Sequence, residues 1–434
     1  NILSSLQWFI FMLSTAVIMP VAVGAAFQFS PVEMASIIRY TLLVVGVSSL
    51  LQIWFGHGLP IAEGPSAMWW AVFLIFAELG PLMPNGTAGI LQSIEMGIII
   101  SGILFIVLSL FKVINLLSKV FTPIVVGTFL VLLVAQLSGA FINQLLGIGY
   151  LSESISMRVA LPAIFVVILS IIFSRSRFTF LKVYSVLFSL TCGWILFALL
   201  GLTKSVPMEA SSLIMLPELF SWGAPRFDIG VVITSMLTAL MVLTNQITSI
   251  QVAERVVERP AQQVYNRSGF ILGINQILAG MISAIPSVAM TLTAGFIETT
   301  KMRDRLPFIV GGVLISLISF FPFAMLFFAS LPVPVAYGAL FLSFSSMIGL
   351  ALKEFSTVEY NENNLFVIGF SLMLGIGSMF VPEKSLQIMP ACFIPVLKNG
   401  LILGVMSCIF LEQMVKYKGF AKKVVKLDKG KSVY

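Results

Sequence analysis

The chain has 434 residues, of which 59% are hydrophobic and 10% are Asp, Glu, Lys or Arg. Soluble domains carry about a quarter charged residues, so this composition excludes an ordinary soluble protein. Apolar runs recur at the length that a bilayer demands, roughly 20 residues for each helical span. The sequence therefore predicts an all-α polytopic membrane protein.

The apolar runs divide into fourteen predicted spans. The first is interpreted as a span and not as a cleaved signal peptide, because no basic region precedes it. The chain starts without methionine, so we expect the native N-terminus to lie upstream. The predicted spans are 7–27, 35–55, 59–78, 94–111, 117–139, 157–174, 183–201, 229–251, 268–285, 286–300, 306–329, 333–352, 364–381 and 390–414.

The basic residues that flank these spans predict the orientation. An even number of spans places both termini on one side. Short loops on that side hold twelve Lys and Arg residues against six on the other side, and a basic tail at 416–434 adds seven lysines. Both termini are therefore predicted to be cytoplasmic, with the protein in the plasma membrane. The net charge of +7 reflects this topology and contact of the tail with anionic lipid, so nucleic-acid binding is not expected.

Enzymatic chemistry has no support in the sequence. Cys192, Cys392 and Cys408 are scattered among apolar residues without metal-ligand or redox spacing. The chain also lacks a recognisable nucleophile–base pair and a nucleotide-binding glycine loop. We expect no metal, no cofactor and no enzymatic activity.

The third and tenth spans contain residues that interrupt a helix. The third includes Pro60, Gly64 and Pro65 within GHGLPIAEGPSAMWWAVF, and the tenth opens at Pro286 within GMISAIPSVAMTLTAGF. Proline removes a backbone donor and clashes with the preceding turn. Each broken span is the third of the seven spans in its half, which favours a 7+7 inverted repeat and a secondary transporter. The alternative is that the prolines only kink packed helices.

The two breaks predict a site. We expect short extended stretches at 61–67 and 287–293, with half-helices that begin near Met68 and Ala294. Non-helical backbone at membrane depth is tolerated when it is buried in protein or lines a cavity. The breaks are therefore expected to present backbone groups and helix N-termini to a small polar solute.

At 279–305 the chain reads AGMISAIPSVAMTLTAGFIETTKMRDR, which resembles, without gaps, the signature of the nucleobase–ascorbate transporters, the group that includes the uracil and xanthine permeases. LPIAEGPSAMWW resembles the third span of that family, LQWFIFMLSTAVIMPVAV its first span and FFASLPVPVAYGALFLSFSSMIG the start of its twelfth. The residues shared with the signature are Gly280, Pro286, Gly295, Thr300, Arg303 and Arg305.

This resemblance implies a domain layout and a function. It implies a core domain at 1–112 and 229–330, a gate domain at 113–228 and 331–415, and commonly a homodimer. The expected function is secondary active transport of a nucleobase, foremost a purine such as xanthine, urate, hypoxanthine or guanine, by proton symport and elevator-type motion of the core against the gate. The alternatives are a uniporter, an anion transporter or channel of the related sulfate-permease architecture, and a receptor that binds without transporting.

The chain departs from the family at the residues that usually decide the substrate. Asn245 stands where the eighth span normally carries glutamate, and Leu292 and Thr293 replace glutamate or glutamine followed by asparagine. Trp8 and Ser249 occupy positions at which many members have histidine. Two helix N-termini, each worth roughly half a positive charge, would then face a neutral site. This predicts a preference for an anionic or electron-rich ligand such as an oxidised purine.

The residues expected at the site follow from the breaks and from the resemblance. Asn245 can donate to and accept from a heterocyclic edge, or it can serve as a contact between helices. Glu63 is a candidate proton carrier, or it satisfies loose backbone N–H groups, and Ser249 is a second coupling candidate. His57, the single histidine, is expected to be solvated on the cytoplasmic side. The predicted substrate-binding residues are Gln7, Ser66, Ala67, Asn245, Gln246, Thr291, Leu292 and Thr293.

Overall fold

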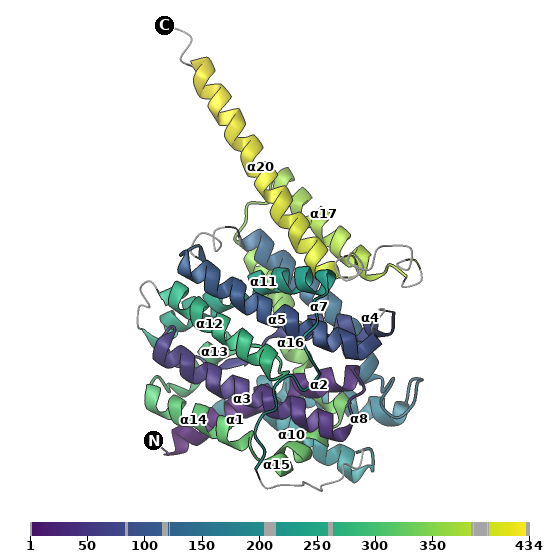
Figure 1. Ribbon diagram of the computed structural model, residues 1–434. Helices are drawn as coiled ribbons and strands as arrows, with labels where there is room; N and C mark the ends of the chain where they lie inside the picture. Colours follow the sequence, from purple (N-terminus) through teal and green to yellow (C-terminus); the bar gives the residue numbers. More distant parts are fainter. Residues whose placement is uncertain are drawn as a thin grey trace. The chain divides into compact units, whose positions relative to one another are not determined.

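The computed structural model describes residues 2–82, 86–114, 120, 122–203, 214–258, 264–382, 385, 397 and 399–430. These residues form helices and one pair of short strands (Figure 1). Contacts divide the chain into two compact units, the first of Asn1–Asn115 and Ser138–Ser343 and the second of Leu116–Leu137 and Phe344–Tyr434. Both broken spans belong to the first unit, which therefore contains the candidate site.

The elements of the first unit begin and end as follows. Its strands are β1 (Glu63–Pro65) and β2 (Ser287–Ala289). Its helices are α1 (Ile2–Ala16), α2 (Ile18–Ala26), α3 (Pro31–Phe55), α4 (Ala67–Leu79), the 3₁₀ helix η1 (Gly80–Leu82), α5 (Gly86–Leu110), α8 (Met157–Ser174), α9 (Thr179–Val183), α10 (Ser185–Leu199), α11 (Ile229–Val257), α12 (Val264–Met281), α13 (Leu292–Thr300), α14 (Arg305–Ile318) and α15 (Pro322–Ala329).

The remaining helices belong wholly or partly to the second unit. Residues of α7 (Pro123–Leu145) and α16 (Val333–Ser356) fall in both units, and α17 (Glu362–Met379) and α20 (Gly400–Gly430) fall in the second. Within that unit α17 packs along α20, where a Cβ placed on Gly400 would lie 2.1 Å from the carbonyl oxygen of Gly375. Glycine at both positions therefore permits backbone contact.

Seven helices of the described residues are long and apolar enough to cross a membrane, or eight if α14 and α15 count as one span. Shorter apolar helices lie at Ala67–Leu79, Ser185–Leu199 and Gly400–Val415. The protein is thus a multi-pass membrane protein. Each of the fourteen predicted ranges overlaps a helix of the structure, whereas the number of crossings and the 7+7 repeat stay predictions.

The expectation that only the third and tenth spans are irregular is wrong. The first span is interrupted at Val17, between α1 and α2, because Pro20 cannot donate to the carbonyl of Ala16. The eleventh predicted span, 306–329, is bent by 87° between α14 and α15. Pro322 lies in the first turn of α15, where proline is favoured. A proline also disfavours helical conformation in the residue before it.

The two strands lie where the sequence predicts extended backbone. β1 and β2 pair antiparallel, with Glu63 opposite Ala289 and Pro65 opposite Ser287. Helix α4 begins at Ala67 and α13 at Leu292, within two residues of the predicted starts. The segments Pro60–Ala67 and Pro286–Thr293 are therefore not continuous helix, and the interpretation of the prolines as simple kinks is wrong.

Close helix packing supports the strands within the first unit. Helices α5 and α12 run side by side (Figure 1), with Gly102 and Gly273 at their contact. A Cβ on Gly102 would lie 2.6 Å from the carbonyl oxygen of Gly273, so only glycine lets the backbones approach this closely. Helix α11 packs against α5, and it also contacts α4, α13 and β2, which brings it beside both breaks.

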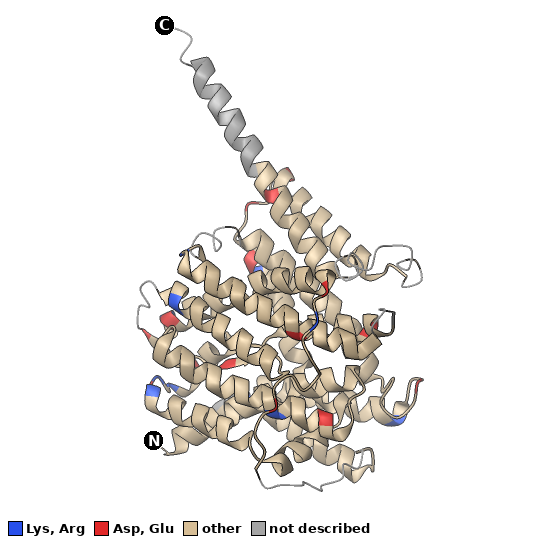
Figure 2. Ribbon diagram, viewed as in Figure 1, with Lys and Arg blue, Asp and Glu red and all other residues tan. Residues whose placement is uncertain are grey.

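Charged residues lie mainly at helix ends and in connections (Figure 2). The buried charged residues include Arg39, Glu63 and Glu95. A charge inside a membrane protein is costly and marks a candidate functional site. Several residues used for the orientation, together with one cysteine and part of the last predicted span, lie outside the described residues: Lys119, Lys204, Arg259, Lys384, Lys398, Cys392 and 386–396.

Candidate functional site

The two breaks bond to each other through their backbones. Beyond the paired strands, the N–H of Ser66 donates to the carbonyl of Pro286 at 2.9 Å, and the N–H of Met290 donates to the carbonyl of Ala62 at 3.0 Å. Every residue of β1 and β2 is buried. Much of the main chain that we expected to hold a solute is therefore satisfied within the protein, as buried backbone groups in a membrane require.

Glycine permits this close pairing. A Cβ on Gly64 would lie 1.8 Å from Sδ of Met290. Real Cβ atoms do not approach a sulfur that closely, so any other residue at 64 would displace the Met290 side chain. Gly64 thus sets how near the third span lies to the tenth.

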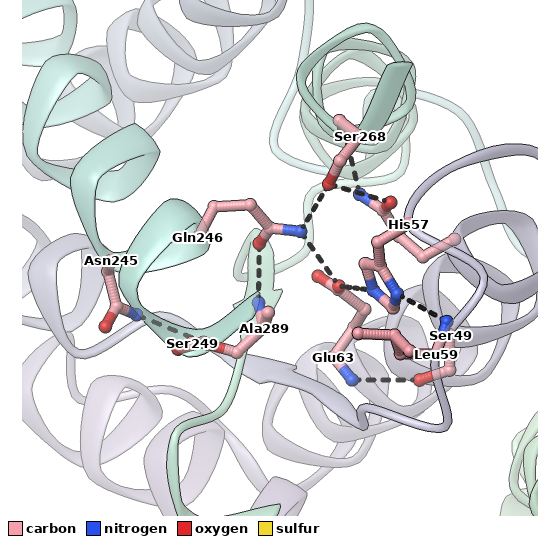
Figure 3. A network of polar contacts seen from close by, with 10 residues as sticks. Ser49, His57, Leu59, Glu63, Asn245, Gln246, Ser249, Ser268 and Ala289 are labelled. Atoms are coloured by element: carbon pink, nitrogen blue, oxygen red, sulfur yellow. Dashed lines mark hydrogen bonds and ion pairs between the residues drawn. The ribbon is translucent and has the colours of Figure 1, made fainter. Parts of the chain in front are cut away.

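The carboxylate of Glu63 is buried beside β2 (Figure 3). Its backbone N–H donates to Oγ of Ser49 on α3 at 3.0 Å. Its Oε1 accepts from Nε2 of Gln246 at 3.2 Å and lies 3.5 Å from Nε2 of His57. The carboxylate thus contacts polar side chains, and its expected alternative role as acceptor for loose backbone N–H groups is not what the structure shows.

The prediction that His57 is solvated is wrong. Its side chain has 0% of its surface exposed, and Nδ1 accepts from the N–H of Leu59 at 3.0 Å. Gly58 adopts a φ of +71°, a conformation that glycine permits, in a turn after α3 where its N–H donates to the carbonyl of Gln52 at 3.1 Å. The histidine is therefore inside the protein and faces Glu63.

Gln246 connects the two broken spans. While its Nε2 donates to Glu63, its Oε1 accepts from the N–H of Ala289 on β2 at 2.7 Å. Nε2 also donates to Oγ of Ser268 at 3.1 Å, and Ser268 in turn donates to Oε1 of Gln52 at 3.1 Å. We call His57, Glu63, Gln246, Ser268 and Gln52 the buried polar network (Figure 3).

Asn245 and Ser249 meet at the carbonyl of the same residue, Ala289. Oγ of Ser249 donates to this carbonyl at 2.8 Å and lies 2.8 Å from Oγ1 of Thr291. Nδ2 of Asn245 makes a long contact of 3.5 Å to the same oxygen. Ala289 therefore joins the buried polar network to Asn245 and Ser249, and through Ser249 to Thr291.

The other predicted residues differ in exposure. Ser66 is fully buried and its Oγ contacts Sδ of Met68. Thr293 is buried, and its Oγ1 has no hydrogen-bond partner in the described part of the chain. The side chain of Leu292 is 58% exposed, whereas Ala67 and Gln7 are half-buried. Gln7 lies on α1, a helix that contacts β1.

Two members of the buried polar network and one neighbour, Ser49, are not among the residues predicted from the sequence. Ser49 and Gln52 on α3 and Ser268 on α12 are polar residues inside apolar spans. The first two are three positions apart and therefore share a helix face, which is a signal that the sequence does contain. Nothing in the sequence shows that this face meets Ser268, because that contact joins residues 216 positions apart.

Residues shared with the transporter signature have local roles in the structure. A Cβ on Gly280 would lie 3.0 Å from the carbonyl oxygen of Glu95, so this glycine lets α12 approach α5. Nη2 of Arg303 donates to Glu258 at 2.8 Å in an exposed ion pair, which contributes about 0–1 kcal/mol. Nη2 of Arg305 lies 3.1 Å from the position of a Cβ on Gly58, beside the turn that buries His57.

The site has the chemistry of a carrier. It offers neutral hydrogen-bonding groups at Asn245, Ser249 and Thr291, and one carboxyl group, Glu63, in a protein interior. The described residues contain no group of three or more His, Cys, Asp or Glu placed to hold a metal ion. Paired broken spans with polar groups between them define the class of secondary membrane transporters.

Comparison with known proteins agrees with this class. The model of a family described as a permease family, that of the xanthine and uracil permeases, matches residues 1–384. YwdJ of Bacillus subtilis (strain 168), named as a candidate purine permease, is 38% identical over 419 residues, which are 95% of each protein. The xanthine permease of the same organism is 26% identical, over an alignment that includes 96% of this chain and 94% of that permease.

The chain therefore belongs to the xanthine and uracil permease family, also called the nucleobase–ascorbate transporters, and is a membrane permease and not an enzyme. Its fold resembles a solved structure, the transmembrane domain of a cyanobacterial bicarbonate transporter, BicA. The TM-score is 0.59 at 15% sequence identity, over 94% of this chain and 97% of that one. At this identity the similarity concerns the fold alone.

Proposed function

We propose that this permease carries a purine nucleobase, foremost an oxidised purine such as xanthine or urate, by proton symport. The observation that carries the proposal is the convergence of Asn245 and Ser249 on the carbonyl of Ala289, with Thr291 beside Ser249 at the start of α13. The names of the related purine and xanthine permeases support a purine over an inorganic anion.

The neutral character of the site motivates the choice among purines. Asn245 offers two donors and one acceptor, which suits a heterocyclic edge that carries both kinds of group. The N-terminus of α13 adds a partial positive charge, and no acidic side chain lies among the site residues Asn245, Ser249, Thr291, Leu292 and Thr293. A base with carbonyl oxygens, or one that is partly ionised, fits these groups better than an unoxidised base.

The coupling proposal places the proton on Glu63. Ser249 does not titrate in the physiological range, and its hydroxyl is occupied by Ala289 and Thr291, so it positions the start of α13 instead. We further propose a homodimer in the cell membrane with both termini cytoplasmic, in which the core at 1–112 and 229–330 moves against the gate at 113–228 and 331–415. Cross-linking of cysteine pairs placed across that boundary would test the movement.

Uptake by the purified protein in proteoliposomes tests the function. We expect saturable uptake of radiolabelled xanthine that unlabelled xanthine, urate and guanine inhibit and that bicarbonate and sulfate do not. Uptake of an anion with no competition from purines would contradict the proposal. Specific purine binding without flux would identify a receptor, and flux that a pH gradient cannot drive would identify a uniporter.

Substitution of Asn245 tests the substrate contact. Asn245→Ala should raise the apparent KM for xanthine about fivefold, because one lost hydrogen bond is worth about 1 kcal/mol and each 1.4 kcal/mol is a factor of ten. Thr244→Val is the matched control on the same helix, since the Thr244 hydroxyl donates within α11 to the carbonyl of Leu240. Equal KM values in the two variants would remove Asn245 from the substrate site.

A further inference from the structure

The hydrogen positions of the buried polar network follow from two backbone amides. A backbone N–H can only donate. The N–H of Leu59 donates to Nδ1 of His57, so Nδ1 must hold a lone pair and the single proton of a neutral imidazole must be on Nε2. Nε2 lies 3.5 Å from Oε1 of Glu63, and its hydrogen makes no hydrogen bond among the described residues.

The second amide fixes the orientation of Gln246. The N–H of Ala289 donates to its Oε1, so its NH₂ group must face the other way. One hydrogen goes to Glu63 and the other to Ser268, whose own hydrogen then goes to Gln52. Both amide hydrogens and the hydroxyl hydrogen are thereby assigned.

Only one atom of the network can then gain a proton without breaking a bond. Protonation of His57 at Nδ1 would set its new N–H against the N–H of Leu59. Oε2 of Glu63, in contrast, is buried and has no hydrogen-bond partner among the described residues. A hydronium ion can transfer its proton to Oε2, which forms one O–H bond, neutralises the carboxylate and leaves water.

Other charged groups lie near this turn. The guanidinium of Arg305 lies beside Gly58, and Nη2 of Arg267 donates to the carbonyl of Phe55 at 3.3 Å. The other titratable residues on the elements packed against the network are Glu33, Arg39 and Tyr40 on α3, Glu254 and Arg255 on α11, and Tyr265 on α12.

We propose that His57 is a fixed neutral side chain whose Nε2–H lies beside Glu63, and that Gln246 transmits the protonation of Glu63 to the backbone of Ala289 at the substrate site. An ionised Glu63 makes a charge-assisted bond to Gln246, and a neutral Glu63 makes a weaker one. Because Gln246 also holds the N–H of Ala289, the change reaches the carbonyl that Ser249 and Asn245 contact. This inference rests on the proposed proton symport.

The single histidine allows a direct test that does not depend on transport. The whole protein, expressed with a tag that lacks histidine, is labelled with ¹⁵N-histidine and placed in lipid, where its nitrogen spectrum comes from His57 alone. At neutral pH we expect one neutral form with the proton on Nε2. An imidazolium at that pH, or a proton on Nδ1, would overturn the proposal.

The pH profile of xanthine uptake tests the positioning role. His57→Phe removes the Nε2–H that lies beside the carboxylate. The falling limb of xanthine uptake should then move to higher pH by about one pH unit, a tenfold change in proton concentration. His57→Gln can still donate and should restore most of the wild-type profile. Identical profiles in all three proteins would refute the role of His57.

The pH dependence of the apparent affinity for xanthine tests the role of Gln246. In the wild type the apparent affinity for xanthine should differ several-fold between about pH 6 and pH 8, since coupled sites affect each other reciprocally. Gln246→Met should abolish that difference, whereas Gln276→Met, which removes another buried amide on α12, should keep it. Retention of the difference in Gln246→Met would disprove transmission through this residue.

Absence of any nucleobase uptake by the wild type would instead refute the proposed function, and the nitrogen spectrum would still decide the state of His57.

Discussion

Glu63→Gln is expected to abolish proton-driven accumulation of xanthine while facilitated flux remains. With the membrane potential clamped, a gradient of one pH unit supports about a tenfold concentration ratio for each coupled proton, since a factor of ten corresponds to about 1.4 kcal/mol. The wild type should approach that ratio and the variant should stop at equal concentrations. Glutamine preserves the size of the side chain and an acceptor for Gln246. A loss of accumulation would therefore reflect the missing proton site and not a misfolded protein.

The chain offers a matched control for this experiment. Glu95 is a second buried carboxyl, on α5, and Ser283 donates a hydrogen bond to it. It is not part of the buried polar network, so Glu95→Gln should accumulate xanthine as the wild type does. Accumulation that survives Glu63→Gln would eliminate Glu63 as the proton carrier. Its loss in both variants would show only that any buried carboxyl is needed for a functional protein.

The breaks could be predicted from the sequence because their cause is local. Pro60, Pro65 and Pro286 each remove a backbone donor, and a membrane chain must then satisfy the freed groups elsewhere. The structure satisfies them by pairing β1 with β2. Pro20 and Pro322 also interrupt helices, although the apolar runs around them are long enough to be interpreted as single spans.

The contacts of the site could not be predicted, because they depend on which helix face meets which neighbour. Asn245 and Gln246 are adjacent amides in one apolar span, about 100° apart around the helix. The structure turns Gln246 toward Glu63 and the N–H of Ala289, and Asn245 toward the carbonyl of that residue. Likewise, GHG at 56–58 signals a turn, but its direction, which buries His57, is set by tertiary packing.

Gly273→Ala should destabilise the protein, although alanine is the better helix former. In an exposed helix this exchange stabilises by about 1 kcal/mol. At Gly273 the added Cβ would lie 2.7 Å from the carbonyl oxygen of Gly102 and 3.0 Å from the N–H nitrogen of Ile106, both backbone atoms that cannot rotate away. Helices α5 and α12 must then separate, and overpacking of this kind costs about 1–3 kcal/mol. A lower melting temperature in detergent measures the loss.

Gly139→Ala provides the opposite expectation in the same protein. Gly139 is within helix α7, and a Cβ there would meet no atom within 4 Å. Its melting temperature should be equal to or above that of the wild type, because only the helix propensity changes. The contrast between two identical substitutions isolates the effect of backbone contact. Since α5 and α11 hold α12 and β2 in place, a Gly273→Ala protein as stable as Gly139→Ala would mean that this contact does not support the site.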